Sequence, residues 1–190
     1  MMPLAQQPAD YLTEADYLEG EKRAEVRHEY INGQVIAMAG SSLRHNDIAL
    51  NLAFALRSAA RGTLCRVNVS DVKVHIEQVQ SYYYPDVVVS CQTEDIAAHS
   101  IKNPCLIVEV TSQSTQWRDF TEKAVAYQKL ESLKAYLVVA QDVVQVTLYF
   151  RDTAGGWQVA RFDTLDQELS LPCPPGTLFK VSDIYAGVES

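Results

Sequence analysis

The stretch Cys105-Leu106-Ile107-Val108-Glu109-Val110-Thr111 decides how this chain is organised. Its apolar residues follow one another almost without a break, which is typical of a β-strand in the middle of a sheet covered on both faces. A carboxylate in such a strand has a large desolvation cost unless another group pairs with it. Glu109 therefore either belongs to a structural ion pair, or binds a ligand or takes part in catalysis.

The segments around this strand predict a sheet with helices packed against it. Asn32-Gly33 separates two half-apolar runs between Val26 and Ala39, which indicates a β-hairpin. Helices are expected from Thr13 to about Gly20, over residues 42–61 and over residues 114–130, and a short helical turn is expected at 182–185 after an extended, proline-rich tail. Further strands are expected at residues 64–68, 72–77, 87–89, 135–140, 143–150 and 157–162. This order predicts a mixed β-sheet flanked by α-helices, in the α/β to α+β range, preceded by an N-terminal helix and hairpin.

Composition limits the classes of protein to consider. The 190 residues, 47% of them hydrophobic, suit a single domain over residues 1–190. The formal net charge of -8 argues against a protein that coats DNA through a basic surface, but it allows an enzyme that meets DNA through a local patch or a bound cation. We expect no membrane span, because no long uncharged apolar run occurs, and we expect a cytoplasmic location, because residues 1–10 lack the basic start and apolar stretch of an export signal.

The four cysteines, at positions 65, 91, 105 and 173, form no CxxC pair and have no pair of histidines nearby. Their spacing therefore does not predict a zinc site. We expect reduced, mostly buried thiols that pack as small apolar side chains.

Asp86 is the first candidate partner for Glu109. It follows Pro85 and opens the run Val87–Val89, and proline is tolerated as the first residue of a strand. Taken alone, the Pro-Asp pair is explained equally well by a turn or a strand cap. If the two strands are neighbours, however, two carboxylates lie at the same end of one sheet, and such oxygen pairs suit Mg²⁺.

Three more polar residues attract attention by their positions. Lys123 falls on the apolar arc of the predicted 114–130 helix, where it either extends its ammonium to solvent, pairs with Asp119 one turn away, or points at a specific group. His45 lies in the apolar stripe of the 42–61 helix, within its first turn, and is either a hydrogen-bonded core residue or a neutral donor to an oxygen. Glu29 precedes the Asn-Gly turn and either joins this group or pairs with Arg27 or Arg44.

The order of these residues resembles a known superfamily of nucleases. The PD-(D/E)xK pattern is similar to Pro85-Asp86, followed by Glu109-Val110-Thr111 on the next strand and by Asp119, Glu122-Lys123 and Tyr127 on the next helix. A closer resemblance, to the restriction endonuclease family labelled Uma-two, rests on Glu29-Tyr30-Ile31-Asn32-Gly33-Gln34-Val35, on Arg44-His45 and on Val108-Glu109-Val110. It covers a core from about residue 12 to 150 and leaves residues 151–190 as a C-terminal extension. The superfamily pattern calls for lysine where this chain has Thr111, so the resemblance points to Lys123 as the lysine supplied from the next helix.

The resemblance implies a Mg²⁺-dependent endonuclease that hydrolyses phosphodiester bonds, most simply those of DNA, with Mn²⁺ as a substitute ion. Asp86, Glu109 and the carbonyl of Val110 would bind the cation, which would polarise the phosphate and lower the pKa of a bound water. Lys123 would position that water or stabilise charge on the phosphate. His45 would contact the phosphate or the water, and Glu29 would complete the acidic cluster. Because cutting both strands of a duplex calls for two sites related by a two-fold axis, a homodimer is expected.

Three other functions remain open from the sequence. A catalytically inactive, nucleic-acid-binding relative of the same fold is favoured by the lack of positive charge and opposed by the complete set of Asp86, Glu109 and Lys123. A glycosidase with two carboxylates would need an aromatic-lined cleft, whereas strand geometry would divide the cluster Tyr82–Tyr84 between two faces. A non-enzymatic assembly protein leaves the misplaced polar residues unexplained.

Overall fold

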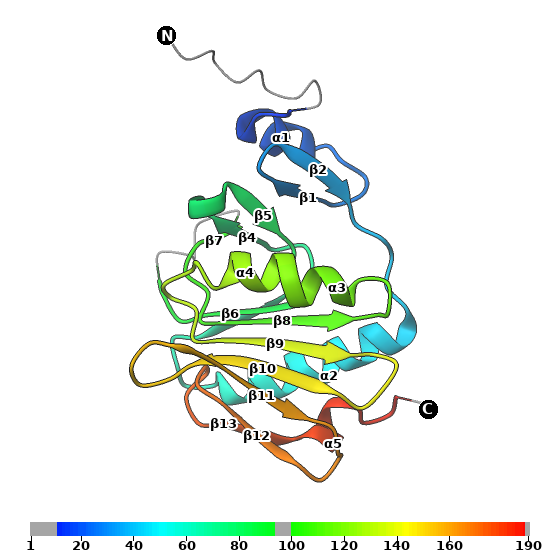
Figure 1. The fold of residues 1–190 in the computed structure, drawn as a ribbon, viewed down its shortest axis with the longest axis vertical. Coiled ribbons are helices and arrows are strands. Elements are labelled where there is room, and N and C mark those ends of the chain that lie inside the picture. The colour runs from blue at the N-terminus through cyan, green and yellow to red at the C-terminus, as the bar shows by residue number, and fades with distance from the viewer. Residues whose placement is uncertain (1–10, 94–99, 189–190) are drawn as a thin grey trace.

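A six-stranded mixed sheet forms the centre of the protein (Figure 1). The structure, a computed structural model, describes residues 11–93 and 100–188. Residues 1–10, on which the expectation of no export signal rests, lie outside this part of the chain. The strands of the sheet, in spatial order, are β11 (Trp157–Phe162), β10 (Val146–Arg151), β9 (Ala135–Ala140), β8 (Leu106–Thr111), β6 (Val87–Ser90) and β3 (Arg66–Val69).

Strand β8 lies inside this sheet, and all six of its residues are buried, as its apolar sequence predicts. It runs parallel to β9 and antiparallel to β6, with Val87 opposite Val108. Asp86 and Glu109 occupy the next pair of positions along the two chains. Directly opposed residues of an antiparallel pair point to the same face, so the register directs both carboxylates to one side of the sheet.

The two faces of the central sheet are covered by different parts of the chain. One face packs against α2 (Leu43–Ala59), through Ile48, Leu52 and Leu56. The Ser42 hydroxyl accepts a hydrogen bond from the backbone of His45 and caps this helix, which fixes His45 in its first turn. The opposite face carries the helical segment after β8 and a second sheet, with the rings of Tyr83 and Tyr127 between the layers.

The second sheet has five strands and contains the expected hairpin. Asn32 and Gly33 both have positive φ, 45° and 94°, which is the geometry of a tight two-residue hairpin turn. A Cβ atom at position 33 would also collide with the ring of Tyr11, so only glycine fits there. Its strands, in spatial order, are β2 (Gln34–Ala37), β1 (His28–Ile31), β5 (Ser81–Tyr83), β4 (Lys73–Ile76) and β7 (Ser100–Ile101). Helix α1 (Glu14–Glu21), capped by Thr13, lies over it, and a short 3-10 turn (Glu77–Val79) joins β4 to β5.

The helix expected over residues 114–130 is shorter and less regular than predicted. It consists of α3 (Gln116–Arg118), a π-helical turn (Asp119–Lys123) and α4 (Ala124–Tyr127). A π turn accommodates one more residue than an α turn, so it changes the direction of the side chains around it. Such turns are frequent at functional sites.

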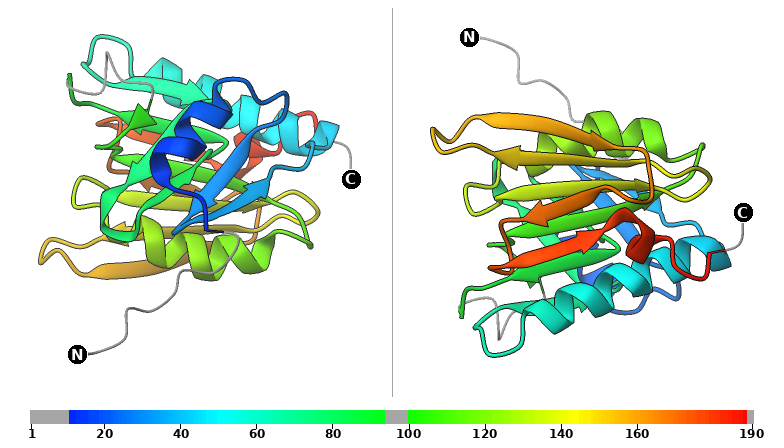
Figure 2. Two further views of the ribbon diagram at one scale, coloured as in Figure 1. Left: turned by 90° about the horizontal axis from the view of Figure 1, so that it is seen from above. Right: turned by 90° about the horizontal axis from the view of Figure 1, so that it is seen from below.

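The C-terminal tail is not simply extended, as the sequence suggested. Residues 168–180 form a hairpin of β12 (Glu168–Leu171) and β13 (Thr177–Lys180), followed by α5 (Val181–Ile184). Leu169, Leu171 and Phe179 pack into the same core as α2, so burial of alternate side chains explains the strands. The ribbon of this hairpin lies beside that of α2 in the right-hand view of Figure 2. Among the described helices, none has the length and apolar character needed to cross a membrane.

The expectation of four reduced cysteines is wrong for this structure, which pairs Cys65 with Cys91 and Cys105 with Cys173 as disulfides. The register of β3 against β6 places Arg66 opposite Ser90, and therefore Cys65 opposite Cys91. The turn of the C-terminal hairpin brings Cys173 to Cys105.

Candidate active site

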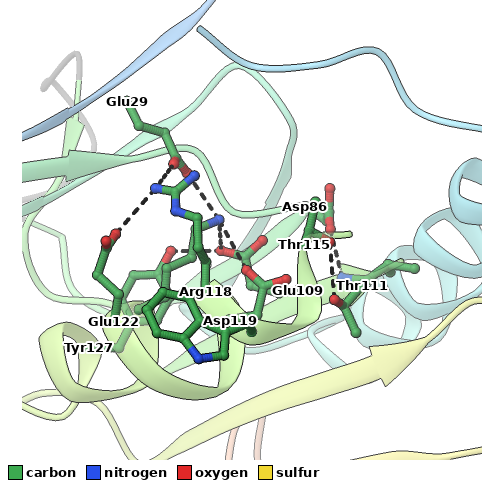
Figure 3. Close-up of polar contacts among 12 residues, drawn as sticks. Glu29, Asp86, Glu109, Thr111, Thr115, Arg118, Asp119, Glu122 and Tyr127 are labelled. Carbon is green, nitrogen blue, oxygen red and sulfur yellow. Dashed lines mark hydrogen bonds and ion pairs between the residues drawn. The ribbon is translucent and has the colours of Figure 1, made fainter. Parts of the chain in front are cut away.

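The Glu109 carboxylate lies between two sheets and is only 4% exposed. Its Oε1 atom accepts a hydrogen bond of 3.0 Å from Lys123 Nζ and one of 2.8 Å from the hydroxyl of Tyr127. Both donors come from the helical segment that follows β8 (Figure 3). The misplaced acid of the central strand therefore has specific partners, as its burial requires.

The Lys123 ammonium contacts two further carboxylates. Its Nζ atom lies 3.0 Å from Oε1 of Glu29 on β1 and 3.4 Å from Oδ1 of Asp119, one turn earlier on the same segment. Lys123 is 7% exposed and is the last residue of the π turn, so its side chain enters the space between the sheets instead of solvent. Of the interpretations open from the sequence, pairing with Asp119 and pointing at a specific group are both present.

Glu29 joins the second sheet to the helical segment. Its Oε2 atom accepts a hydrogen bond of 2.8 Å from Nη2 of Arg118, and the same nitrogen bonds Glu122 at 3.2 Å. Among the described residues the ion pairs of Glu29 are with Arg118 and Lys123, and not with Arg27 or Arg44. Arg27 pairs with Asp71 instead. Within the described part of the chain, Glu29 Oε1 is a buried oxygen that accepts no well-directed hydrogen bond, although Lys123 Nζ is near.

The charges of this cluster do not balance without a proton or another cation. Three carboxylates, those of Glu29, Glu109 and Asp119, contact the single ammonium of Lys123. Of these three, Arg118 reaches Glu29 alone, and it also pairs with a further carboxylate, that of Glu122. Burial raises the pKa of Glu109 well above its ordinary value of 4.5, and it also raises the pKa of Asp119. Burial alone would lower the pKa of Lys123, but the three carboxylates outweigh it and raise that pKa, so the lysine stays charged.

Asp86 lies at the edge of this cluster and is more accessible, at 18% side-chain exposure. Its Oδ1 atom is 2.8 Å from Nε2 of His45, and its Oδ2 atom accepts a 2.7 Å hydrogen bond from the backbone N–H of Val110. The start of α2 and the end of β8 thus fix the carboxylate from two sides. Proline at position 85 leaves the residue before it extended and opens the strand at this point.

The donor atoms fit a hard divalent cation in kind. Asp86 and Glu109 offer carboxylate oxygens on one side of the sheet, and Glu29 offers a buried oxygen without a directed hydrogen bond. In the described ranges, however, no three carboxylate or imidazole ligand atoms lie within 4.8 Å of one another. The arrangement therefore suits an ion that takes one or two protein carboxylates and completes its shell with water and phosphate oxygens, as Mg²⁺ does.

All five side chains predicted from the sequence lie in two connected groups. Glu29 and Glu109 both contact the ammonium of Lys123. Asp86 and His45 form a separate pair, which is joined to β8 through the N–H of Val110. The roles assigned to these residues, and to the carbonyl of Val110, stay predictions. Three further residues line the site. Asp119 was expected only as a possible partner of Lys123, and Tyr127 only as part of the helix pattern. Arg118 falls on the polar side of the predicted helix, so the sequence gave it no role in the site.

A solved structure defines the class of protein to which this fold belongs. The crystal structure of a protein from Anabaena variabilis, described as a putative nuclease belonging to DUF820, matches with a TM-score of 0.76. The match covers 92% of this chain and 97% of that chain at 17% sequence identity. The two proteins therefore share a fold, with a mixed sheet between helices.

The family is identified by sequence. The family model Uma2, described as "Putative restriction endonuclease", matches residues 14–182, and the chain belongs to this family. It is 35% identical over 182 residues to the uncharacterized protein slr1290 of Synechocystis sp. strain PCC 6803, covering 95% of both chains. It is 34% identical over 141 residues to a second uncharacterized protein of that organism, sll1609, covering 73% of this chain and 80% of the relative.

Proposed function

We propose that this protein is a Mg²⁺-dependent endonuclease that hydrolyses phosphodiester bonds in DNA. The observation that carries the proposal is the contact between Glu109 on the central strand and the buried ammonium of Lys123, 3.0 Å apart, beside Asp86 on the adjacent strand. Two acids and a lysine on one side of a sheet are the groups that phosphodiester hydrolysis with a metal ion requires. Membership of a restriction endonuclease family supports the same reaction class.

Each residue has a defined task in this proposal. Asp86, Glu109 and the Val110 carbonyl hold the cation, which when bound polarises the phosphate and lowers the pKa of a coordinated water. The Lys123 ammonium donates a hydrogen bond to the attacking water or to a phosphate oxygen, where it stabilises the added negative charge. Glu29 and Asp119 hold Nζ of Lys123 in place through contacts of 3.0 and 3.4 Å. His45 fixes the Asp86 carboxylate through Nε2. We also assign to it the contact with the phosphate or the water.

The charge of the protein and the symmetry of duplex DNA bear on how the protein binds DNA, on its oligomeric state and on its location. With a formal net charge of -8, the protein repels DNA at long range, and a bound cation supplies the local positive charge that a phosphate needs. We assign the activity to a homodimer, because two sites related by a two-fold axis cut both strands of a duplex. The cytoplasm, where Mg²⁺ and DNA are both present, is the proposed location.

The test uses supercoiled plasmid, linear duplex, single-stranded DNA and RNA, each with Mg²⁺, with Mn²⁺ and with EDTA. We expect nicked or linear plasmid with either metal and intact plasmid with EDTA. Glu109→Gln and Lys123→Met should abolish cutting, whereas the matched controls Glu131→Gln and Lys129→Met, which alter surface charges nearby, should retain it. Cutting by Glu109→Gln at the wild-type rate would exclude the proposed site.

A second candidate is a catalytically inactive, nucleic-acid-binding relative of the same fold. One observation favours it: the Lys123 ammonium already forms ion pairs with Glu109 and Glu29, at the place where a cation would bind. This candidate predicts that Mg²⁺ leaves the thermal midpoint unchanged and that every nucleic acid stays intact. A Mg²⁺-dependent rise in the midpoint that disappears in Asp86→Asn would argue against it, since a bound ion stabilises the native state.

A further inference from the structure

All four cysteines of the protein meet at one point, far along the chain from one another. Besides its pairing with Cys65, the Cys91 sulfur lies 3.4 Å from the sulfur of Cys105 and 3.5 Å from that of Cys173. The sulfurs of Cys65, Cys91 and Cys173 all lie within 4.8 Å of one another. In the described residues this is the sole group of three or more ligand atoms close enough to share one metal ion.

The fold brings these residues together through four separate segments. Cys65 precedes β3, Cys91 follows β6 and Cys105 precedes β8. Because these neighbouring strands are antiparallel, the three cysteines lie at the same end of the three strands. Backbone bonding fixes this edge, because the Cys105 N–H donates to the carbonyl of Val89. Cys173 comes from the turn of the C-terminal hairpin, on the layer that covers the sheet. Four side chains approaching from two layers can surround a single atom.

Two of the sulfur–sulfur separations are close to those of a mononuclear tetrahedral site. Zinc binds cysteine sulfur at about 2.3 Å, so two sulfurs of a regular tetrahedron lie about 3.8 Å apart. The contacts of Cys91 with Cys105 and Cys173, at 3.4 and 3.5 Å, are close to that edge length and belong to different disulfides. A multi-iron cluster would hold its cysteines further apart, since inorganic sulfide and several irons separate them.

The surroundings of the cluster favour thiolates. Cys65 shares a cavity of about 580 Å³ with Arg57, Arg61 and Arg66, and no carboxylate lines this cavity among the described residues. Positive charge beside a thiol stabilises the thiolate, which is the form that binds metal. Three of the four side chains, Cys65, Cys105 and Cys173, are buried, so bulk water has little access to the sulfurs.

We propose that, in the reduced protein, Cys65, Cys91, Cys105 and Cys173 bind one zinc ion as a four-thiolate structural centre, separate from the Asp86–Glu109 site. Four thiols and one Zn²⁺ give a zinc tetrathiolate of charge -2 and release four protons, and the three arginines offset that charge. The two disulfides are the oxidised form of the same residues. A reducing cytoplasm, which the proposed function also assumes, keeps such cysteines reduced and favours metal binding over disulfides.

The zinc centre joins the C-terminal hairpin to the edge of the central sheet. One metal atom links all four segments, so each ligand affects the stability of the whole centre, whereas each of two independent disulfides links only two segments. Loss of any single ligand should therefore release the metal and loosen the hairpin. If the protein instead holds two separate disulfides, a substitution of Cys65 should leave the bond between Cys105 and Cys173 intact.

The first experiment measures metal in the Glu109→Gln variant, which keeps the proposed nuclease site from contributing to the zinc count. The protein is purified anaerobically with a phosphine reductant, given zinc and desalted, and its zinc and iron contents are measured against a variant with all four cysteines changed to serine. We expect one zinc per chain and none in the serine variant. Iron with acid-labile sulfide, or no zinc above the serine variant, would overturn the proposal.

The second experiment tests the ligands on folded protein. Cobalt substituted for zinc should give thiolate-to-metal charge-transfer bands and the strong visible bands of tetrahedral coordination, with an intensity expected of four sulfur ligands. Cys173→Ser should lose these bands, whereas Cys173→His should retain zinc as a three-cysteine, one-histidine site. Cobalt spectra without sulfur charge transfer, or full zinc retention by Cys173→Ser, would refute the assignment. These readouts do not depend on DNA cleavage, so either proposal can fail while the other stands.

Discussion

Lys123→Met tests the charge balance of the candidate active site, because it removes the cation that three carboxylates share. Methionine is similar in length and apolar, so the packing against Tyr83 and the helical segment is largely kept. The buried acids Glu109, Glu29 and Asp119 then lose contacts of 3.0, 3.0 and 3.4 Å. Removing one partner of a buried ion pair destabilises a protein by about 3–5 kcal/mol. For a chain of this size, that is a fall in the thermal midpoint of about 6–20 °C.

Glu109→Gln changes the charge of the same cluster in the opposite direction, because it removes a negative charge where Lys123→Met removes a positive one. It removes one negative charge from a cluster whose acids outnumber its bases, and the amide oxygen can still accept the hydrogen bond of Tyr127. We therefore expect the free energy of unfolding to change by less than about 1 kcal/mol, or to rise. Both variants should nevertheless abolish DNA cutting.

The assay is urea unfolding followed by circular dichroism, at neutral pH and with EDTA, for the wild type and both variants. We expect opposite effects of the two variants on stability and the same loss of cleavage. If Lys123→Met unfolds at the wild-type urea concentration, Lys123 is not holding three buried acids. If Glu109→Gln is destabilised as strongly as Lys123→Met, the cluster has no excess of negative charge, and the proposed charge imbalance is wrong.

Three further results are expected. Burial raises the pKa of Glu109 in the folded state above its ordinary value of 4.5. The contribution of the protonated carboxyl to stability is therefore complete below pH 4.5 and is lost as the pH rises. Because Mg²⁺ binds the deprotonated carboxylate, the increase in thermal midpoint caused by Mg²⁺ should grow with pH, and an increase that is the same at every pH would contradict this. His45→Ala should weaken Mg²⁺ binding about 10–100-fold in calorimetric titrations, because it frees the Asp86 carboxylate, and unchanged affinity would remove His45 from the site. Tyr127→Phe should lower the unfolding free energy by about 1–3 kcal/mol in urea, and no change would show that its 2.8 Å hydrogen bond to Glu109 has no net effect.

Local patterns in the sequence were sufficient for much of the fold. The continuous apolar run of β8 and the Asn-Gly hairpin each depend on interactions within a few residues, and the structure contains both. The misplaced Lys123 was also visible, because a helical wheel needs only the order of residues. Element ends and the irregular helix were less well predicted, since the π turn depends on what the segment packs against.

The long-range arrangement accounts for the remaining differences. Arg118 looked like a surface residue, yet it reaches Glu29, 89 positions earlier in the chain, because the second sheet lies across the helical segment. The C-terminal strands were missed because their alternate residues find an apolar surface only once α2 is in place. The pairing of Glu109 with Lys123 likewise needed both the register of β8 and the direction set by the π turn.

The sequence by itself determined that a buried strand carries an unusual acid, that a second acid opens another strand, and that a lysine lies on the wrong side of a helix. Only the tertiary structure determined which charged side chains pair with one another. It also placed close together four cysteines whose spacing in the sequence matches no motif. The physical reason is that propensity and periodicity act over a few residues, whereas strand register and layer packing bring together groups that are distant in the chain.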